Sequence, residues 1–285
     1  MRNEQEMYDL ILSVAKSDER VLAVYMNGSR TNPNVQKDMY RDYDIVFVVA
    51  ETQSFIKDKS WISVFGDLAI VQEPDFNDFG WGLNHDLSRS YTWLMLFTDD
   101  NRIDLGIKVL DYALEDYLSD TLCIKLLDKN NVLPDIAESN DSMYHIKQPS
   151  KQQYDGCCNE FWWCLNNVAK GIARDQMPYA HRMYMQIVHK ELEKMVEWYI
   201  AMSKDYTVST GMWGKYFKKY LSPEFYDQYA KTYANGNYEN LWSAIFTACD
   251  LFRNLAKHVA LHSKYTYNQQ DDDGMMRYLE RMRSK

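Results

Sequence analysis

The fold of the first half is decided by residues 21–50, which read VLAVYMNGSRTNPNVQKDMYRDYDIVFVVA. The apolar run at 21–26 stops at Asn27-Gly28, the pattern of a strand that ends in a turn. A second run, at 42–50, begins with Asp-Tyr-Asp and continues with six apolar residues. This stretch therefore predicts two strands, with a polar turn after the first and two carboxylates at the start of the second.

Gly28, Ser29 and Arg30 make up the turn after the first predicted strand. Glycine lets a backbone approach a ligand closely. The following amides and the Ser29 hydroxyl can donate to phosphate, with support from a helix N-terminus if a helix begins here. The Arg30 guanidinium is a planar group of donors suited to phosphate. We expect a phosphate-binding turn, although a Gly-Ser pair by itself more often marks an ordinary strand-to-helix turn.

Asp42 and Asp44 open the second predicted strand. Side chains alternate along a strand, so these two carboxylates share a face, where they repel each other and shift each other's pKa. A hard cation such as Mg²⁺ removes that repulsion because it takes oxygen ligands at about 2.0–2.1 Å. We expect a metal site here. The alternative is that both acids cap an exposed strand end.

Asp104 lies between Ile103 and Leu105 in an apolar segment. Carboxylates inside apolar strands are rare unless they are paired or bind a metal. The alternative places Asp104 at an exposed sheet edge with Arg102 as its partner. The order of Gly-Ser, Asp-x-Asp and a lone acid in an apolar strand is more specific than any one of its parts, and it predicts a third acid for the same site.

The chain has 285 residues, of which 46% are hydrophobic and 26% are charged, as in ordinary globular proteins. Residues 1–135 hold 13 lysines and arginines against 24 aspartates and glutamates, a balance of −11, whereas residues 136–285 hold 19 and 17, a balance of +2. Because residues 1–135 are this acidic, they repel a polyphosphate backbone, which argues against a nucleic-acid partner and favours a cationic small molecule. The alternative is that these acids only keep the protein soluble.

The sequence has neither the run of about 18 apolar residues that a membrane span needs nor the basic-then-apolar start of a secretory signal. Five cysteines, an odd number without C-x-x-C spacing, fit free thiols in a reducing compartment. We therefore expect a cytoplasmic protein with no membrane partner, and a monomer is compatible with the sequence.

Hydrophobic periodicity divides the chain into two parts. The first has helices at 4–16 and 55–65 and strands that we expect at 21–26, 42–50, 68–72, 91–97 and 102–110. The second has helical periodicity at 154–174, 179–204, 212–220, 223–234, 238–262 and 275–283. Its acidic run at 271–274 is typical of a solvated turn. We predict an α+β fold, with a mixed β-sheet and flanking helices at 1–135 and an all-helical domain at 136–285.

The pattern of Gly28-Ser29, Asp42-x-Asp44 and Asp104 resembles that of the polymerase-β-type nucleotidyltransferases. Within that superfamily the chain is similar to aminoglycoside 6-adenylyltransferases, the streptomycin-modifying enzymes, over nearly its whole length. The segments that carry the similarity are GSRTN (28–32), RDYDI (41–45), CCNEFW (157–162), KGIAR (170–174) and LFR (251–253). The similarity is loosest at 179–186, where Ala-His-Arg-Met stands in place of Ala-Ile-Asp-His, so the acid of that run is missing.

The resemblance implies an ATP- and Mg²⁺-dependent transferase that moves AMP to a hydroxyl of an aminoglycoside antibiotic. The expected acceptor is streptomycin at its 6-hydroxyl, and the expected result is resistance. In this interpretation the first domain is the catalytic nucleotidyltransferase and the helical domain binds the substrate. The two rivals are a nucleotidyltransferase that acts on another hydroxylated small molecule and a catalytically silent binding module with the same fold.

The resemblance also implies roles for particular residues. The expected metal ligands, which are also catalytic, are Asp42, Asp44 and Asp104. The expected nucleotide-binding residues are Gly28, Ser29, Arg30 and Lys170. Asp104 is expected to be either the last metal ligand or the general base, and Glu160 is a second catalytic candidate for the base. The alternatives are that Glu160 is a helix-face carboxylate paired with a lysine and that Lys170 is a surface cation.

Overall fold

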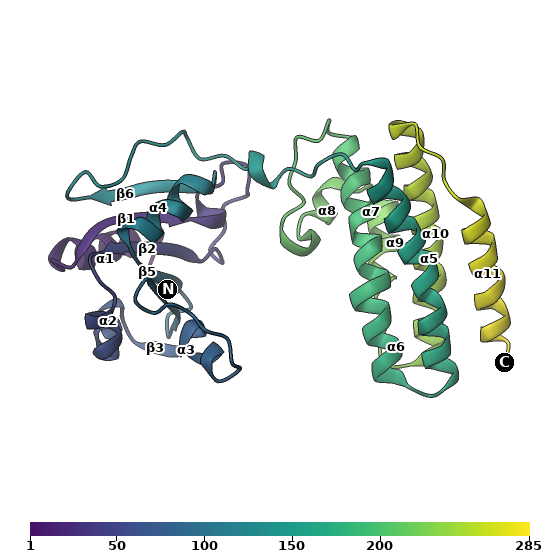
Figure 1. Ribbon diagram of the computed structural model, residues 1–285, viewed down its shortest axis with the longest axis horizontal. Coiled ribbons are helices and arrows are strands. Elements are labelled where there is room, and N and C mark those ends of the chain that lie inside the picture. Colours follow the sequence, from purple (N-terminus) through teal and green to yellow (C-terminus); the bar gives the residue numbers. More distant parts are fainter. The chain divides into compact units, whose positions relative to one another are not determined.

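The computed structural model describes residues 1–285, which form two compact units, Met1–Met143 and Tyr144–Lys285 (Figure 1). The predicted domain division after residue 135 falls in the irregular segment that follows the last strand of the first unit. The assignment of one domain to catalysis and the other to substrate binding stays a prediction. Neither unit contains a helix that is both long and apolar enough to cross a membrane.

The first unit is built on a six-stranded sheet with the strand order β3-β4-β5-β2-β1-β6. The strands are β1 (Val21–Asn27), β2 (Tyr43–Val49), β3 (Leu68–Gln72), β4 (Ser90–Phe97), β5 (Arg102–Val109) and β6 (Cys123–Asp128). β2 and β5 pair in parallel, whereas every other neighbouring pair is antiparallel. The expected mixed sheet is confirmed, and its two central strands are those on which the sequence placed the carboxylates.

The two faces of this sheet are covered to different extents. One face packs on α1 (Glu4–Ser17), α2 (Gln53–Lys57) and the 3₁₀ helix Lys59–Phe65, with a core of large side chains that includes Phe47 and Trp93. On the other face, Tyr25 and its neighbours on β1 and β2 pack under α4 (Leu110–Ser119). Over β3 and β4 this second face is open, and Ile70 and Leu96 there are 64% and 39% exposed.

Most predicted elements of the first unit are present, and three were missed. The helix expected at 55–65 is α2 followed by the 3₁₀ helix, because Asp58 interrupts it and caps the second piece. The missed elements are α3 (Pro74–Phe79), α4 and β6. α4 begins at Leu110 directly after β5, so no turn residues mark its start. β6 is a half-exposed edge strand without the continuous apolar run that revealed β1 and β2.

The second unit is all helical, as expected. Its helices are α5 (Lys151–Ala173), α6 (Met177–Met183), α7 (His189–Met202), α8 (Phe217–Tyr220), α9 (Pro223–Ala230), α10 (Tyr238–Ser263) and α11 (Gln269–Arg283). A π-helical turn, Tyr184–Val188, joins α6 to α7. α7 packs on both α5 and α10, and α11 lies along α5 (Figure 1). In the core, Phe161 stacks on Phe252 with 3.8 Å between the ring centroids.

The acidic run at 271–274 is not a solvated turn, contrary to the expectation from sequence. It lies at the start of α11, and Asp272 is fully buried there. The Asp272 carboxylate accepts hydrogen bonds from Arg253 Nε at 2.6 Å, from Arg253 Nη2 at 2.7 Å and from the Tyr267 hydroxyl at 2.8 Å. The local sequence did not indicate this burial because the main partner, Arg253, lies on another helix.

Candidate active site

The parallel pairing of β2 and β5 brings the predicted acids together. Asp44 and Asp104 are register partners on these strands, so their side chains project from the same face at adjacent positions. Asp42 lies just before β2 rather than within it. The Arg102 guanidinium joins the set, with Nη1 at 3.3 Å from an Asp42 oxygen and Nη2 at 2.7 Å from an Asp104 oxygen. All three acids therefore lie at the same end of the two central strands.

The alternative position of Asp104, at an exposed sheet edge, is wrong. β5 lies between β2 and β4, inside the sheet, and the Asp104 side chain is 19% exposed. Its partner is Arg102, as that alternative supposed, through two hydrogen bonds of 2.7 Å each. Arg102 therefore offsets part of the negative charge of the three acids.

Burial and mutual repulsion make Asp44 a weak acid. Its pKa is raised to about 6, first by burial and then by the charges of Asp104 and Asp42, against the smaller opposing effects of Arg102 and Arg30. Burial also raises the pKa of Asp42, with Arg102 opposing the shift and Asp104 adding to it. Carboxylates whose charged form is disfavoured in this way gain from a cation placed among them.

Gly28 gives Asp44 the space that it occupies. Gly28 has a φ of +78°, and a Cβ on it would lie 2.2 Å from Asp44 Oδ2, so any other residue would strain the backbone and displace the Asp44 carboxylate. Gly28, Ser29 and Arg30 form a single 3₁₀ turn, and the longer helix that would have supported a phosphate is absent. The Ser29 hydroxyl makes no hydrogen bond within the protein, which leaves it available to a ligand.

Asn27 belongs to the same site, although the sequence did not single it out. It is the register partner of Asp44 on β1, and its side-chain oxygen Oδ1 is buried without a hydrogen-bond partner. Buried amide oxygens without a donor are rare, and such an oxygen is a suitable ligand for a hard cation. The available signal was its position at the end of β1, directly before the Gly-Ser turn.

Arg30 is held by the protein itself. Its Nε donates to the carbonyl of Asp42 at 3.0 Å, Nη2 donates to the carbonyl of Arg41 at 2.8 Å, and Nη1 donates to the Glu4 carboxylate at 2.8 Å. The Arg30 side chain is only 5% exposed. The predicted phosphate contact of Arg30 stays a prediction, and the structure shows that most of its donors are already used.

The donor chemistry of the site fits Mg²⁺. The carboxylates of Asp42, Asp44 and Asp104 and the amide oxygen of Asn27 are an all-oxygen set, which this ion prefers. As the side chains stand, no three acidic, histidine or cysteine residues converge closely enough to enclose a metal ion. The Arg102 guanidinium lies against two of the acids instead, so it would have to give way to a bound cation.

Glu160 and Lys170, the two site residues predicted for the helical part, both lie exposed on α5 in the second unit. Glu160 Oε1 accepts a hydrogen bond from the Cys164 thiol at 3.4 Å, and Lys170 Nζ donates to Asn166 Oδ1 at 2.7 Å. The lysine partner proposed as the alternative for Glu160 is not there. The catalytic role of Glu160 and the nucleotide contact of Lys170 stay predictions.

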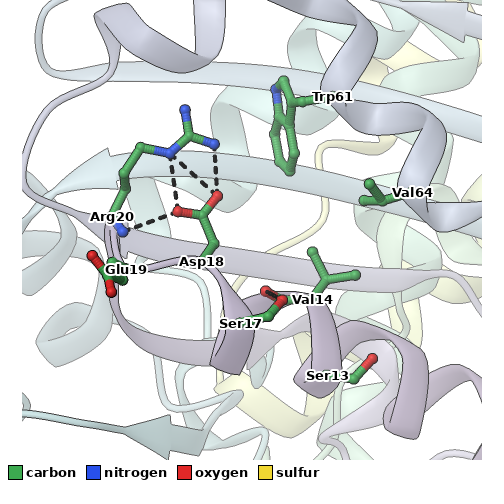
Figure 2. Close-up of a pocket in the computed structure, with 8 residues that line it drawn as sticks. All are labelled: Ser13, Val14, Ser17, Asp18, Glu19, Arg20, Trp61 and Val64. Atoms are coloured by element: carbon green, nitrogen blue, oxygen red, sulfur yellow. Dashed lines mark hydrogen bonds and ion pairs between the residues drawn. The ribbon is translucent and has the colours of Figure 1, made fainter.

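A surface hollow lies at the end of α1 (Figure 2), and none of the three acids lines it. It is lined by Ser13, Val14, Ser17, Asp18, Glu19, Arg20, Trp61 and Val64. Arg20 there forms an ion pair with Asp18 at 2.6 Å and lies 3.6 Å from the centre of the Phe55 ring. Its charge is thus already paired, and the hollow offers no chemistry that competes with the three acids.

Comparison with known proteins shows that the chain is similar to one family over nearly its whole length. The model of the streptomycin adenylyltransferase family matches residues 1–282. The chain is 36% identical to an aminoglycoside 6-adenylyltransferase of Bacillus subtilis (strain 168), with 98% of each chain covered. It is 34% identical to one from Campylobacter jejuni, with 100% of this chain and 97% of the relative covered. A crystal structure of an aminoglycoside 6-adenyltransferase from Bacillus subtilis is 30% identical over the whole of both chains, with a TM-score of 0.49.

Proposed function

Because the chain belongs to the streptomycin adenylyltransferase family, we propose that it transfers AMP from ATP to a hydroxyl of an aminoglycoside, with the 6-hydroxyl of streptomycin as the acceptor. Family membership makes it an adenylyltransferase with ATP as co-substrate. The observation that carries the proposal is the meeting of Asp42, Asp44 and Asp104 at one end of β2 and β5. A binding module without catalysis has no use for three carboxylates that repel one another.

In the proposed reaction the acceptor hydroxyl attacks the α-phosphorus of ATP. Its proton passes to a base, the new O–P bond forms, and the bond to pyrophosphate breaks. Asp42, Asp44 and the Asn27 amide oxygen would hold Mg²⁺, which when bound neutralises phosphate charge and makes the hydroxyl easier to deprotonate. Asp104, beside Asp44 in the register, is our choice for the base or for the remaining ligand, ahead of Glu160.

The nucleotide phosphates are proposed to bind at the Gly28 turn. The missing side chain at Gly28 keeps the approach to Asp44 clear, and the free Ser29 hydroxyl can donate to a phosphate oxygen. Lys170, an exposed cation with one amide partner, is our proposed further contact to the nucleotide. These assignments leave Arg30 outside the set, because most of its donors are already used within the protein.

The acceptor is proposed to lie on the open part of the sheet next to Asp104. The register places Leu94 of β4 beside Asp104 and Gln72 of β3 beside Leu94, all on one face. Leu96 and Ile70, the next pair on this face, are 39% and 64% exposed. An apolar strip that leads away from carboxylates suits a cationic sugar, whose C–H groups can pack on it while its charges face the acids.

We place the reaction in the cytoplasm and propose neither a nucleic-acid nor a membrane partner. All five cysteines are free and buried, as suits a reducing compartment. The negative balance of residues 1–135 opposes binding to a polyphosphate chain.

The proposal is tested by incubating the purified protein with Mg-ATP and a panel of aminoglycosides. We expect mass spectrometry to show one added AMP on streptomycin, and NMR of the product to place it on the 6-oxygen. AMP on a different hydroxylated compound would replace streptomycin as the acceptor and keep the reaction type. Metal-dependent ATP binding without transfer to any acceptor would instead support the silent binding module.

A further inference from the structure

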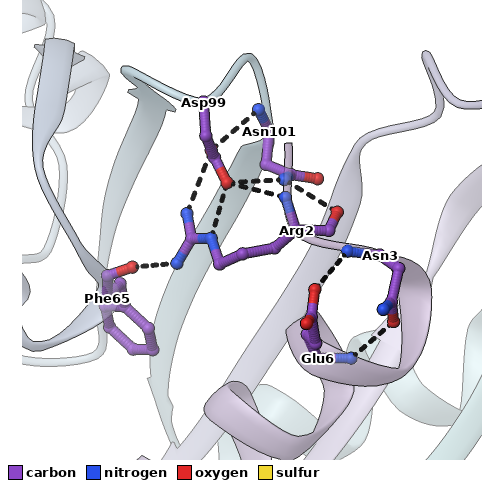
Figure 3. Close-up of polar contacts among 6 residues, drawn as sticks. All are labelled: Arg2, Asn3, Glu6, Phe65, Asp99 and Asn101. Atoms are coloured by element: carbon purple, nitrogen blue, oxygen red, sulfur yellow. Dashed lines mark hydrogen bonds and ion pairs between the residues drawn. The ribbon is translucent and has the colours of Figure 1, made fainter.

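The start of the chain is tied to the turn between β4 and β5 (Figure 3). The Arg2 amide and its Nε donate to the Asp99 carboxylate at 3.0 and 2.7 Å, and Arg2 Nη1 donates to the Phe65 carbonyl at 2.6 Å. Asn101 Nδ2 donates to the Arg2 carbonyl at 3.1 Å. Asn101 directly precedes β5, so Arg2 fixes the end of the strand at which Asp104 lies.

The next residues begin α1 and direct Glu4 toward two buried arginines. Asn3 Oδ1 accepts from the Glu6 amide at 3.0 Å, and Glu6 Oε2 accepts from the Asn3 amide at 2.7 Å (Figure 3). This reciprocal cap fixes the first turn of the helix. The Glu4 carboxylate in that turn lies 2.8 Å from Arg30 Nη1 and 3.7 Å from Arg41 Nη2, and the two arginine side chains are 5% and 7% exposed.

Arg30 links Glu4 to the main chain at Asp42. Its Nε and Nη2 donate to the carbonyls of Asp42 and Arg41, and its guanidinium lies 3.6 Å from the centre of the Tyr43 ring. A guanidinium is planar and has several donors, so it can bind three acceptors in different directions and also lie over an aromatic ring. An ammonium group has no such planar shape.

We propose that residues 2–4, here called the N-terminal brace, hold the loop that carries Asp42 and the strand that carries Asp104 at a fixed separation. The brace reaches the loop through its glutamate and the strand through its arginine. It therefore helps to fix the distance between two carboxylates, which Arg102 also links directly, without contacting either of them. The inference rests on the proposed function only in treating these carboxylates as the metal site.

Arg30 is then a positioning residue and not a phosphate ligand, and lysine at this position separates the two roles. A lysine keeps the positive charge that a phosphate needs, but it cannot bridge the Asp42 carbonyl, the Arg41 carbonyl and Glu4 at once. A positioning role thus predicts a defect in metal binding before any nucleotide is present, whereas a phosphate role predicts a defect in ATP binding alone.

The first test compares Arg30→Lys with Lys37→Met, which removes an exposed cation from the same loop. Mn²⁺ alone is titrated into each protein, and free Mn²⁺ is followed by electron paramagnetic resonance. We expect Arg30→Lys to weaken Mn²⁺ binding roughly 10- to 100-fold and to lower kcat by a similar factor, as removal of outer-shell support does at metal sites. The KM for ATP should change little, and Lys37→Met should match the wild type. Wild-type Mn²⁺ binding with a raised KM for ATP would overturn the proposal.

The second test does not depend on catalysis. Glu4→Gln keeps the shape of a side chain that is 49% exposed, so the variant should fold, and the melting temperature verifies this. We expect faster amide hydrogen exchange in residues 28–44 than in the wild type, with α5 unchanged. Unchanged exchange in that loop would overturn the brace. If the wild type neither bound Mn²⁺ nor transferred AMP, the proposed function would fail, and this exchange comparison would still decide whether the brace exists.

Discussion

Asp272 in the second unit is fully buried and Asp44 in the first is partly buried, and the surroundings of these two carboxylates differ. Asp272 accepts two hydrogen bonds from Arg253 and one from Tyr267, and Arg253 also contacts Asp250 at 2.7 Å. Asp44 has buried surroundings and two like charges, which raise its pKa to about 6. Arg102 forms ion pairs with the neighbouring Asp42 and Asp104 and not with Asp44 itself.

This difference in hydrogen bonding and neighbouring charge distinguishes a carboxylate that stabilises the fold from one that is placed to bind a ligand. A buried charge that only stabilises a structure is paired with donors around its oxygens, because an unpaired one is unfavourable. A buried acid left beside other acids disfavours the folded state unless a cation joins it, and such acids concentrate at functional sites. Three predictions test whether Asp44 and Asp272 differ in this way, and a fourth tests which acid is the general base.

The largest expected effect is the loss of catalytic activity in the Asp44→Asn variant. Asparagine keeps the volume and removes the charge that would hold a metal, so we expect kcat/KM for AMP transfer to fall by about 10⁴-fold, since metal-ion catalysis supplies several kcal/mol. Asp42→Asn should behave alike. Circular dichroism should show a retained fold. Turnover near the wild-type rate in both variants would remove these residues from the metal site.

Asp272→Asn should act on stability instead. It leaves the guanidinium of Arg253 without its bidentate partner inside the second unit, and we expect the free energy of unfolding to fall by about 3 kcal/mol, the low end for breaking a buried pair because Asp250 remains. Urea denaturation measures this. The remaining folded protein should keep its kcat. A variant as stable as the wild type would show that the ion pair has no structural role.

Asp104→Asn is expected to lower kcat by roughly 10²–10³-fold, within the range for loss of a general base. If Asp104 is only the base, metal-dependent ATP binding should survive, whereas loss of a ligand should weaken Mg²⁺ affinity and let excess Mg²⁺ restore part of the rate. Glu160→Gln is the matched variant in the second unit. A larger kcat loss there than in Asp104→Asn would transfer the base role to Glu160.

The smallest expected effect is a gain in stability from Asp44→Asn that depends on pH. Asp44 holds its proton more tightly in the folded chain than in the unfolded chain, so the wild type loses stability as pH rises from about 4, the usual Asp pKa, to about 6. Asparagine has no such loss. The variant should exceed the wild type on the order of 1–3 kcal/mol above pH 6, and the difference should shrink toward pH 4. Urea titrations without metal at both pH values check this, and equal stability at pH 7.5 would contradict it.

The sequence determined the elements and the identity of the acids. The apolar runs at 21–26 and 45–49 fixed β1 and β2, because a strand buried on both faces needs such a run. The long helices of the second unit followed from periodicity, since one face of each is buried. The order of Gly28-Ser29, Asp42-x-Asp44 and Asp104 pointed to one site, because each residue type is unusual in its local context.

Only the tertiary structure decided which of these residues meet. Parallel pairing of β2 with β5 set Asp44 beside Asp104, and antiparallel pairing with β1 added the unpartnered oxygen of Asn27. Arg30 is a second case. Its position in the sequence predicted a phosphate contact, but in the structure its guanidinium donates to two backbone carbonyls and to Glu4. The physical reason is that alternation and periodicity are local and tell which way a side chain faces, whereas pKa, pairing and ligand geometry depend on charges and dipoles brought in from distant parts of the chain.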